Sequence, residues 1–267
     1  MYAFEYQRPA SVADAKAALS ADARFLAGGQ SLIQAMKLRL SSSERLVDLG
    51  GIADLKGIKV DAGHIIIGAM VTHAAVAASA DVQRACPALA ELAGGIGDPM
   101  VRNMGTIGGS IANADPAACY PAAVLGLGAT IHTNQRTIGA DAFFTGLYET
   151  ALQPGELITA VSFPALQKAA YVKYKQPASR FALVGVFVSQ ASSGSGGVRV
   201  AVTGAKGSVF RATEIEAALT TSFTPEAAKA VKMPTTGINA DMHGSAVYRA
   251  AMISVMASRA VAAVLAR

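Results

Sequence analysis

The sequence predicts an α+β fold in two parts, and three observations lead to this prediction. With 52% hydrophobic and 15% charged residues among 267, the chain has the composition of a globular protein with a sizeable core. Strand and helix patterns alternate along the first part, whereas three strand patterns followed by three helices fill the last part. Pro164 and the polar stretch after it separate the two patterns, so we expect the boundary between residues 164 and 170.

The first part begins with a compact β-α-β-α-β unit. Aromatic and apolar runs predict the strands, and apolar residues at helical spacing predict the helices. The expected strands are Tyr2–Tyr6, Arg24–Ala27 and Arg45–Leu49, and the expected helices are Ala13–Leu19, with Ser11 as its cap, and Gln30–Leu40.

A second unit follows, in which turn residues separate short apolar runs. Asp61-Ala62-Gly63 reads as the turn of a hairpin, and Asn134-Gln135 as the tip of another. The glycine-dense stretch 94–114 is too irregular to predict a regular element. The other expected elements are hairpin strands at 57–60 and 64–68, helices at 72–78, 80–93 (broken near Pro87) and 120–127, a hairpin at 129–138, and a strand at 156–163.

The last part reads as an antiparallel meander followed by helices. Strands are expected at 171–176, 181–189 and 198–203, with the turn Ser192–Gly197 joining the last two. Helices are expected at 212–219, 225–231 and 245–266. The C-terminal helix is apolar, but Arg249 and Arg259 interrupt it, which favours a packed or partner-facing helix over a membrane span.

Composition excludes several classes of function. The net charge of +5 comes from dispersed Lys and Arg without a basic run, so nucleic-acid binding is not expected. The N-terminus lacks the pattern of a secretory signal. Cys86 and Cys119 cannot form a disulfide framework, and an iron–sulfur cluster takes about four ligands, so we expect a reducing, cytoplasmic compartment.

The first candidate binding loop is Ala27-Gly28-Gly29-Gln30-Ser31, between an expected strand and an expected helix. Two glycines allow the backbone to approach a ligand closely. The helix start offers free N–H groups to an anion, and Ser31 adds a hydroxyl. A tight turn without a ligand explains the same residues equally well.

The second candidate loop is Gly105-Thr106-Ile107-Gly108-Gly109-Ser110, which continues to Asn113 and Asp115. It combines glycines with two hydroxyls. Two anion-binding loops in one domain suit a diphosphate bridge held from both sides. They therefore predict a dinucleotide cofactor rather than a single phosphate.

Other sites are disfavoured by missing patterns. The sequence has neither the G-x-G-x-x-G fingerprint of a Rossmann NAD site nor the Gly-Lys of a Walker A loop. It has no G-x-S-x-G elbow, and its four histidines show no metal-ligand spacing, so surface or core positions are the better interpretation. Asp98 and Asp115 lie in loop sequence, where turn and capping roles are commoner than acid–base catalysis.

The two loops, in order along nearly the whole chain with several other motifs, resemble a known family. The sequence is similar to the FAD-binding medium subunits of molybdenum hydroxylases, the family of the carbon monoxide dehydrogenase medium subunit and the xanthine dehydrogenase FAD-binding subunit. The matching segments are Ala27–Ser31 with Met36–Arg39, Ile96–Ser110, Leu46–Leu49, Gly68-Ala69 with Thr72-His73, Phe143–Gly146, Pro154–Ile158, Phe181–Val186 and His243–Arg249.

The resemblance implies a fold and a set of site residues. The fold is the two-subdomain FAD-binding architecture of the vanillyl-alcohol-oxidase type, at residues 1–166 with subdomains of about 1–55 and 56–166, followed by an α+β C-terminal domain at 167–267. The implied FAD-binding residues are Ala27, Gly28, Gly29, Gln30, Ser31, Thr106, Ile107, Gly108, Gly109, Ser110, Asn113, Asp115, Cys119, Ile158, Lys175 and Phe181.

The resemblance also implies a place for each group of these residues. Gly28–Ser31 would meet the FAD diphosphate together with Thr106, Gly108 and Gly109, and Ser110 and Asn113 would follow the ribityl chain or the adenosine. Ile158 would pack near the isoalloxazine. Lys175 and Phe181 would surround the flavin, although a core position in the sheet explains Phe181 equally well.

One departure from the family concerns the end of the second loop. The family commonly has an aspartate after the sequence Asp115-Pro116-Ala117-Ala118, whereas this chain has Cys119. A thiol is a weak donor and carries no charge when protonated, so the potential or affinity of the flavin is expected to differ. Alternatively, Cys119 is simply a small buried residue.

The function implied is electron transfer within a complex. A large subunit with a molybdenum–cytosine dinucleotide would hydroxylate the substrate, and a small subunit would carry two [2Fe–2S] clusters. This chain would hold FAD, without catalytic or metal-binding residues of its own, in a dimer of heterotrimers. The alternatives are a stand-alone FAD-dependent oxidase or reductase of the same fold, or a nucleotide sensor.

Overall fold

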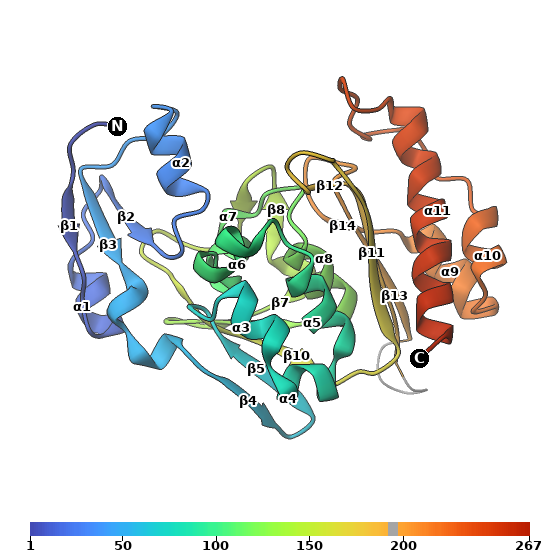
Figure 1. The fold of residues 1–267 in the computed structure, drawn as a ribbon, viewed down its shortest axis with the longest axis horizontal. Coiled ribbons are helices and arrows are strands. Elements are labelled where there is room, and N and C mark those ends of the chain that lie inside the picture. The colour runs from blue at the N-terminus through green and yellow to red at the C-terminus, as the bar shows by residue number, and fades with distance from the viewer. Residues whose placement is uncertain (192–196) are drawn as a thin grey trace.

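The N-terminal part of the molecule is a small parallel sheet with two helices. The computed structural model describes residues 1–191 and 197–267. Strands β1 (Glu5–Gln7), β2 (Ala23–Leu26) and β3 (Arg45–Asp48) pair in the order β1-β3-β2, all parallel, and α1 (Val12–Ala17) and α2 (Leu32–Lys37) connect them (Figure 1). The expected β-α-β-α-β unit is therefore confirmed.

Two elements of this unit are shorter in the structure than the sequence predicts. The first strand begins at Glu5 rather than Tyr2, because its pairing with β3 reaches only from Glu5 to Gln7. Helix α2 ends at Lys37 rather than Leu40. Leu38 and Leu40 have the apolar spacing of a helix but are 71% and 79% exposed, and Arg39 between them has a φ of 59°.

The middle of the molecule is an antiparallel sheet covered by helices. Its strands are β4 (Ile58–Asp61), β5 (His64–Gly68), β10 (Ile158–Pro164), β6 (Thr130–Thr133) and β7 (Thr137–Gly139), in the order β4-β5-β10-β6-β7. The helices are α3 (His73–Ala78), α4 (Ala80–Ala85), α5 (Pro87–Gly94), α6 (Pro99–Met104), α7 (Ile107–Asn113) and α8 (Tyr120–Leu127). The expected break at Pro87 separates α4 from α5.

The stretch 94–114 corrects the expectation of an irregular segment, since it contains α6 and α7. Asp98 caps α6 by accepting a hydrogen bond from the Val101 N–H at 2.9 Å, and Pro99 occupies the first turn. Thr106 caps α7 in the same way. The glycines obscured these short helices, which depend on their caps and on packing rather than on intrinsic helix propensity. The small hairpin of β8 (Phe144–Gly146) and β9 (Glu149–Thr150) was not predicted from the sequence.

The C-terminal part is an antiparallel sheet with helices on its outer face. Strands β11 (Ala169–Lys175), β12 (Ala182–Gln190), β13 (Val198–Thr203) and β14 (Phe210–Arg211) follow one another in the sheet. Helices α9 (Thr213–Thr221) and α11 (Ala246–Leu265) lie against it, and α10 (Pro225–Ala230) packs on α9 and α11 (Figure 1). The expected meander and the three helices are confirmed, whereas the expected turn at 192–196 lies outside the described residues.

This C-terminal sheet is buried on both faces, which joins it to the middle of the molecule. Val186 and Val188 of β12 point to the core shared with α11, whereas Phe187 between them joins the core of the middle sheet and α8. Helix α11 is long and apolar enough to cross a membrane, and half of its most apolar window is buried inside the molecule. Its packing against the sheet accounts for its composition.

A buried carboxylate ties the β6–β7 hairpin to the start of β10. Glu156 accepts hydrogen bonds from Thr133 Oγ1 at 2.7 Å, from Arg136 Nε at 3.0 Å and from the Gln153 N–H at 2.8 Å. The pKa of Glu156 is lowered to about 2, foremost by Arg136 and further by the Gln153 N–H and Thr133. Burial acts in the opposite direction but is outweighed.

We expect this carboxylate to contribute to acid sensitivity. The folded pKa of about 2 lies below the ordinary 4.5, so the contribution is present above about pH 4.5 and is lost as the pH falls toward 2. In urea titrations at several pH values, Glu156→Gln should flatten this decline and lower the free energy of unfolding at pH 7 by roughly 1–3 kcal/mol. Glu214→Gln, at an exposed position on α9, is the control and should change neither. An unchanged pH dependence in Glu156→Gln would contradict the assignment.

Candidate functional site

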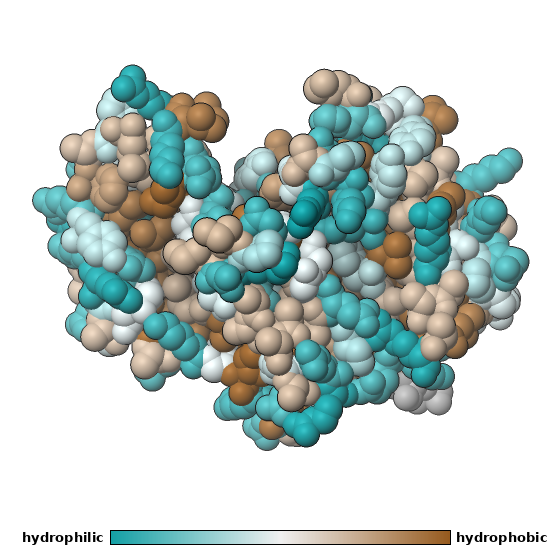
Figure 2. All heavy atoms as spheres, viewed as in Figure 1, coloured by the Kyte–Doolittle hydropathy of each residue, from teal (hydrophilic) through white to brown (hydrophobic). Residues whose placement is uncertain are grey.

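A cavity of about 400 Å³ lies where the three parts of the molecule meet. Figure 2 shows the molecule hollowed between the N-terminal part and the rest. The walls of the cavity come from the loop after β2, from α6 and α7 with their connection, and from the end of β11 with the turn that follows. The volume falls within the roughly 300–1,000 Å³ typical of ligand pockets.

The first glycine loop touches the second loop directly. A Cβ on Gly28 would lie 2.1 Å from the Met104 carbonyl oxygen and 2.8 Å from the Gly105 Cα, so only glycine permits this backbone contact. Gly29 has a φ of 71°, in the left-handed region that favours glycine. Gln30 Nε2 donates to the Gly28 carbonyl at 3.3 Å. The loop is therefore shaped by close approach to its neighbour as well as by the turn into α2.

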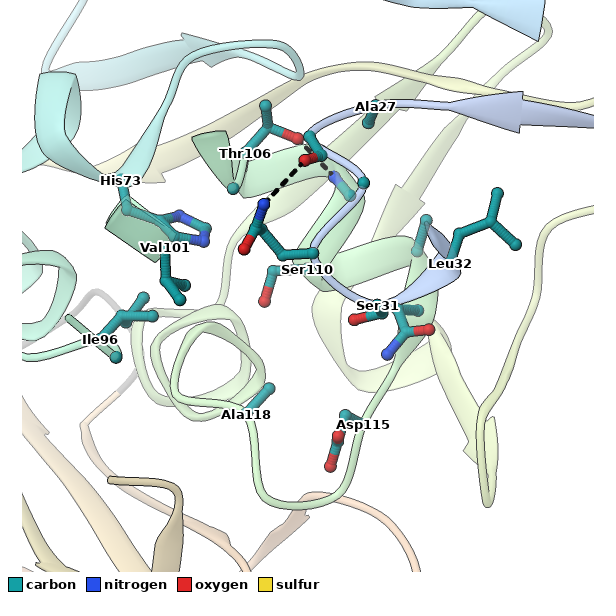
Figure 3. A pocket seen from close by; sticks show the side chains of 18 of the residues that line it. Ala27, Ser31, Leu32, His73, Ile96, Val101, Thr106, Ser110, Asp115 and Ala118 are labelled. Carbon is teal, nitrogen blue, oxygen red and sulfur yellow. Dashed lines mark hydrogen bonds between the residues drawn. The ribbon is translucent and has the colours of Figure 1, made fainter. Parts of the chain in front are cut away.

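The second loop presents the start of α7 to the same cavity. Thr106 Oγ1 accepts from the Gly109 N–H at 3.2 Å, and a Cβ on Gly109 would lie 3.2 Å from the Ala27 Cβ. In Figure 3, Ser110 lies between the side chains of Ser31 and Leu32 and those of His73, Val101 and Ile96. The two loops thus form one continuous glycine-rich surface with hydroxyls on both sides.

The structure brings most of the predicted site residues to this cavity. The predicted residues that line it are Ala27, Gly28, Gly29, Gln30, Ser31, Thr106, Gly109, Ser110, Asn113, Asp115, Cys119 and Phe181. Phe181 is 48% exposed, so it is not a core residue of the sheet, the alternative for it.

Four predicted residues lie elsewhere. Ile107, the first residue of α7, is fully buried, and a Cβ on Gly108 would lie 2.5 Å from the Ala69 Cβ, so both face the middle sheet. Ile158 is buried in β10. Lys175 is exposed, and Lys173 lines the cavity in its place. Strand alternation puts both lysines on one face, but an irregularity in the pairing between Tyr174 and Lys175 breaks that alternation.

Lys173 connects the C-terminal sheet to the cavity wall. Its Nζ donates to the Gly95 carbonyl at 2.9 Å, to the Arg180 carbonyl at 2.8 Å and to Cys119 Sγ at 3.4 Å. Arg180 in turn donates to the Gly97 carbonyl at 3.1 Å. The loop after α5 is therefore held by cations from the C-terminal sheet.

The charges at the cavity favour an anionic ligand. Arg24, Lys173 and Arg180 line it, and Asp115 is the acidic residue among its lining residues. Asp115 accepts from the Ala117 N–H at 2.8 Å, and burial raises the pKa of Asp115 despite this bond. Asp115 and the helix cap Asp98 thus have the turn and capping roles expected for them, and Asp115 also faces the cavity (Figure 3).

His73 is a cavity residue that sequence reasoning missed. It is 4% exposed at the start of α3, and burial, with a smaller contribution from Arg102, lowers the pKa of His73 to about 4. The ring is therefore neutral at pH 7, and its Nδ1 is buried without a hydrogen-bond partner in residues 1–191 and 197–267. The pair Thr72-His73 belongs to a segment that matches the family, but a lone histidine after a helix cap has no metal-ligand or catalytic spacing that would have indicated a site.

These residues fit a flavin dinucleotide. Two closely packed glycine loops and three cations, Arg24, Lys173 and Arg180, line the same cavity, a combination that suits a diphosphate. Leu32, Ile96, Val101 and Phe181 supply apolar surface for ring systems. Within the part of the chain that the structure describes, no group of three or more His, Cys, Asp or Glu is placed to hold a metal ion.

Comparison with known proteins agrees with this geometry. Residues 2–166 match the family described as the FAD binding domain in molybdopterin dehydrogenase. The carbon monoxide dehydrogenase medium chain of Hydrogenophaga pseudoflava is 36% identical over 99% of this chain and 98% of its own. The nicotine 6-hydroxylase medium subunit of Paenarthrobacter nicotinovorans is 34% identical over 97% and 96%.

The fold agrees as well. The solved structure of reconstituted CO dehydrogenase from Oligotropha carboxidovorans contains a chain that superposes with a TM-score of 0.90 at 36% identity, over 100% of this chain and 99% of that chain. This chain therefore agrees with its relatives in sequence and in fold along nearly its whole length. The chain belongs to the FAD-binding medium subunits of the molybdenum hydroxylases, a family of oxidoreductase subunits.

Proposed function

We propose that this chain takes electrons from the [2Fe–2S] clusters of a small subunit and passes them to an external acceptor, within a heterotrimeric molybdenum hydroxylase. The observation that carries the proposal is the pair of touching glycine loops at a cationic cavity. The family match and the relatives named as medium chains support it. FAD, when bound, supplies redox chemistry that accepts electrons singly or in pairs.

The roles of the residues follow from their chemistry. Gly28, Gly29 and Gly109 allow the two loops to pack against each other and present their backbone to the diphosphate, and Ser31 and Ser110 offer hydroxyl donors to it. Neighbouring cations reduce the free-energy cost of bringing the diphosphate out of water. The apolar residues orient the ring systems and exclude water. We propose the other lining residues of the predicted set, Ala27, Gln30, Thr106, Asn113, Asp115, Cys119 and Phe181, as the rest of the FAD site.

The partners follow from what this chain cannot supply. It has two cysteines, and a [2Fe–2S] cluster takes about four protein ligands, so the clusters would lie on a small subunit. A large subunit would hold the molybdenum–cytosine dinucleotide and choose the substrate. The relatives are named for carbon monoxide and for nicotine, which agrees with a substrate chosen on another chain. We propose a dimer of heterotrimers in the cytoplasm.

We propose an FAD-binding domain at residues 1–166, with subdomains of about 1–55 and 56–166, and a C-terminal domain at 167–267. Three hydrophobic clusters, centred on the N-terminal, middle and C-terminal parts, support this division. They meet at the boundaries, since Phe187 and Ala201 join the middle cluster and Met70 and Leu157 join the N-terminal one.

Purification under native conditions tests the proposal. We expect a flavin absorption spectrum, release of FAD at about one per chain, and co-purification of a large and a small chain with an iron–sulfur contribution to the spectrum. A colourless protein that does not take up added FAD would overturn the cofactor assignment. An FAD-containing chain that turns over a substrate by itself would favour a stand-alone oxidase or reductase instead.

A further inference from the structure

A small polar cluster lies in the cavity wall on the side of the C-terminal sheet. It consists of Cys119, Tyr171, Lys173 and Thr203, which we call the Cys119 cluster. Cys119 is 5% exposed, lines the cavity and precedes α8. The Lys173 ammonium donates to its sulfur at 3.4 Å. The thiol thus combines a positive neighbour with access from the cavity.

Two buried hydroxyls of the Cys119 cluster lack hydrogen-bond partners. Tyr171 OH and Thr203 Oγ1 are both buried, and neither has a partner among the described residues. They meet above Gly185, where a Cβ would lie 2.4 Å from Tyr171 OH and 2.8 Å from Thr203 Oγ1. Burial foremost, and then the Cys119 thiol beside it, raises the pKa of Tyr171, while Thr203 acts in the opposite direction. The Cys119 sulfur next to this hydroxyl is a weak acceptor. An oxygen atom bound to that sulfur would provide the acceptor that is missing.

The second cysteine gives a contrast within the same chain. Cys86 is fully buried between α4 and α5 and does not line the cavity, and burial raises the pKa of the Cys86 thiol to about 11. Reactive cysteines have a positive environment and partial access, whereas buried cysteines in apolar surroundings are inert. Of the two thiols, the structure therefore singles out Cys119.

We propose that Cys119 is a site of reversible oxidation by hydrogen peroxide, and that Lys173 and Tyr171 hold its sulfenic acid in the wall of the cofactor cavity. The sulfur gives an electron pair to one peroxide oxygen, so that the S–O bond forms as the O–O bond breaks. The departing hydroxide takes the thiol proton and leaves as water. The sulfur is oxidised by two electrons and the peroxide is reduced by two, which balances the step.

The experiment measures sulfenic acid at both cysteines. The full-length chain is exposed to hydrogen peroxide with a cyclic 1,3-diketone that traps sulfenic acid, and the peptides containing Cys119 and Cys86 are quantified by mass spectrometry. We expect labelling at Cys119 at least about tenfold above that at Cys86, reversed by a thiol reductant when the trap is left out. Equal labelling of the two, or none at Cys119, would overturn the proposal.

Matched variants test the two supporting side chains. Tyr171→Phe removes only the hydroxyl, and Lys173→Met removes the ammonium; each should reduce labelling at Cys119 by about five- to tenfold. The controls Tyr174→Phe and Lys175→Met, at exposed positions on the same strand, should label like the parent chain. Lys173→Met also leaves the Gly95 and Arg180 carbonyls without their donor, which can loosen the cavity wall. In that case the result for Tyr171→Phe decides the test. Unchanged labelling in Tyr171→Phe would show that the two hydroxyls only border a void or a buried water.

Discussion

Replacing Gly28 by alanine should reduce FAD affinity by roughly 10- to 100-fold, one of the largest effects expected of a single methyl group in this chain. The new Cβ would lie 2.1 Å from the Met104 carbonyl oxygen and 2.8 Å from both the Met104 carbonyl carbon and the Gly105 Cα, and these backbone atoms cannot rotate away. The two glycine loops must then separate. Because both loops border the cavity, separation misplaces the N–H groups and hydroxyls that would meet the diphosphate.

The measurement is FAD binding by fluorescence quenching, with thermal unfolding of the FAD-free chain alongside it. Gly139→Ala is the control, because a Cβ there would have no atom within 4 Å and the residue does not have a positive φ. It should bind FAD like the parent chain. Gly28→Ala with unchanged affinity would show that the contact between the loops does not shape the site. An unfolded variant would show instead that the contact is needed for the fold.

The glycine loops could be predicted from the sequence because close backbone approach requires a specific residue type. A Cβ on Gly28 would meet the distant Met104 carbonyl, and a Cβ on Gly109 would meet its own cap Thr106 at 2.9 Å and the distant Ala27 at 3.2 Å; such positions leave a visible pattern of glycines. The dinucleotide interpretation needed only that pattern and three hydroxyls, those of Ser31, Thr106 and Ser110. Caps were visible in the same way at Ser11 and Thr72, whose hydroxyls accept from the first turns of α1 and α3.

The rest of the site depends on tertiary pairing that leaves no local pattern. Lys173 lines the cavity and Lys175 does not, because the pairing of β11 with β12 is irregular after Tyr174. An irregular strand pairing of this kind does not change the alternation of apolar residues in the sequence, so the sequence gives no sign of it. His73 is held at the cavity by its backbone N–H, which donates to the Gly105 carbonyl at 3.0 Å and joins the start of α3 to the end of α6. The sequence could therefore predict the backbone of the site better than its charged wall.

The C-terminal sheet affects the cavity through backbone contacts as well as through Lys173. The Gly204 N–H donates to the Pro116 carbonyl at 2.7 Å, and the Ala182 N–H donates to the Ala117 carbonyl at 3.3 Å. The segment between Asp115 and Cys119 is thus attached to the ends of β12 and β13. Whatever fixes those strand ends also fixes one wall of the cavity.

The residue that fixes them is Arg249 of α11, and replacing it should cause the largest loss of stability expected here. Arg249 is 3% exposed, and its Nη1 donates to the Leu183 carbonyl at 2.6 Å and to the Gly204 carbonyl at 2.9 Å. Its Nη2 pairs with Asp241 at 2.7 Å, which lowers the pKa of that carboxyl. Arg249→Met would leave two buried carbonyls without these donors and remove the partner of Asp241.

We expect Arg249→Met to lower the free energy of unfolding by about 3–5 kcal/mol, because the groups left behind are desolvated and unpaired. Arg259→Met is the matched control: it lies on the same helix with an exposed side chain, and should stay within about 0.5 kcal/mol of the parent chain. FAD affinity should fall in Arg249→Met even at temperatures where the chain is fully folded, since the strand ends hold the wall at Asp115–Cys119. A variant that is destabilised but binds FAD normally would show that α11 supports the fold alone, and that the cavity wall is fixed by Lys173 and the loops without it.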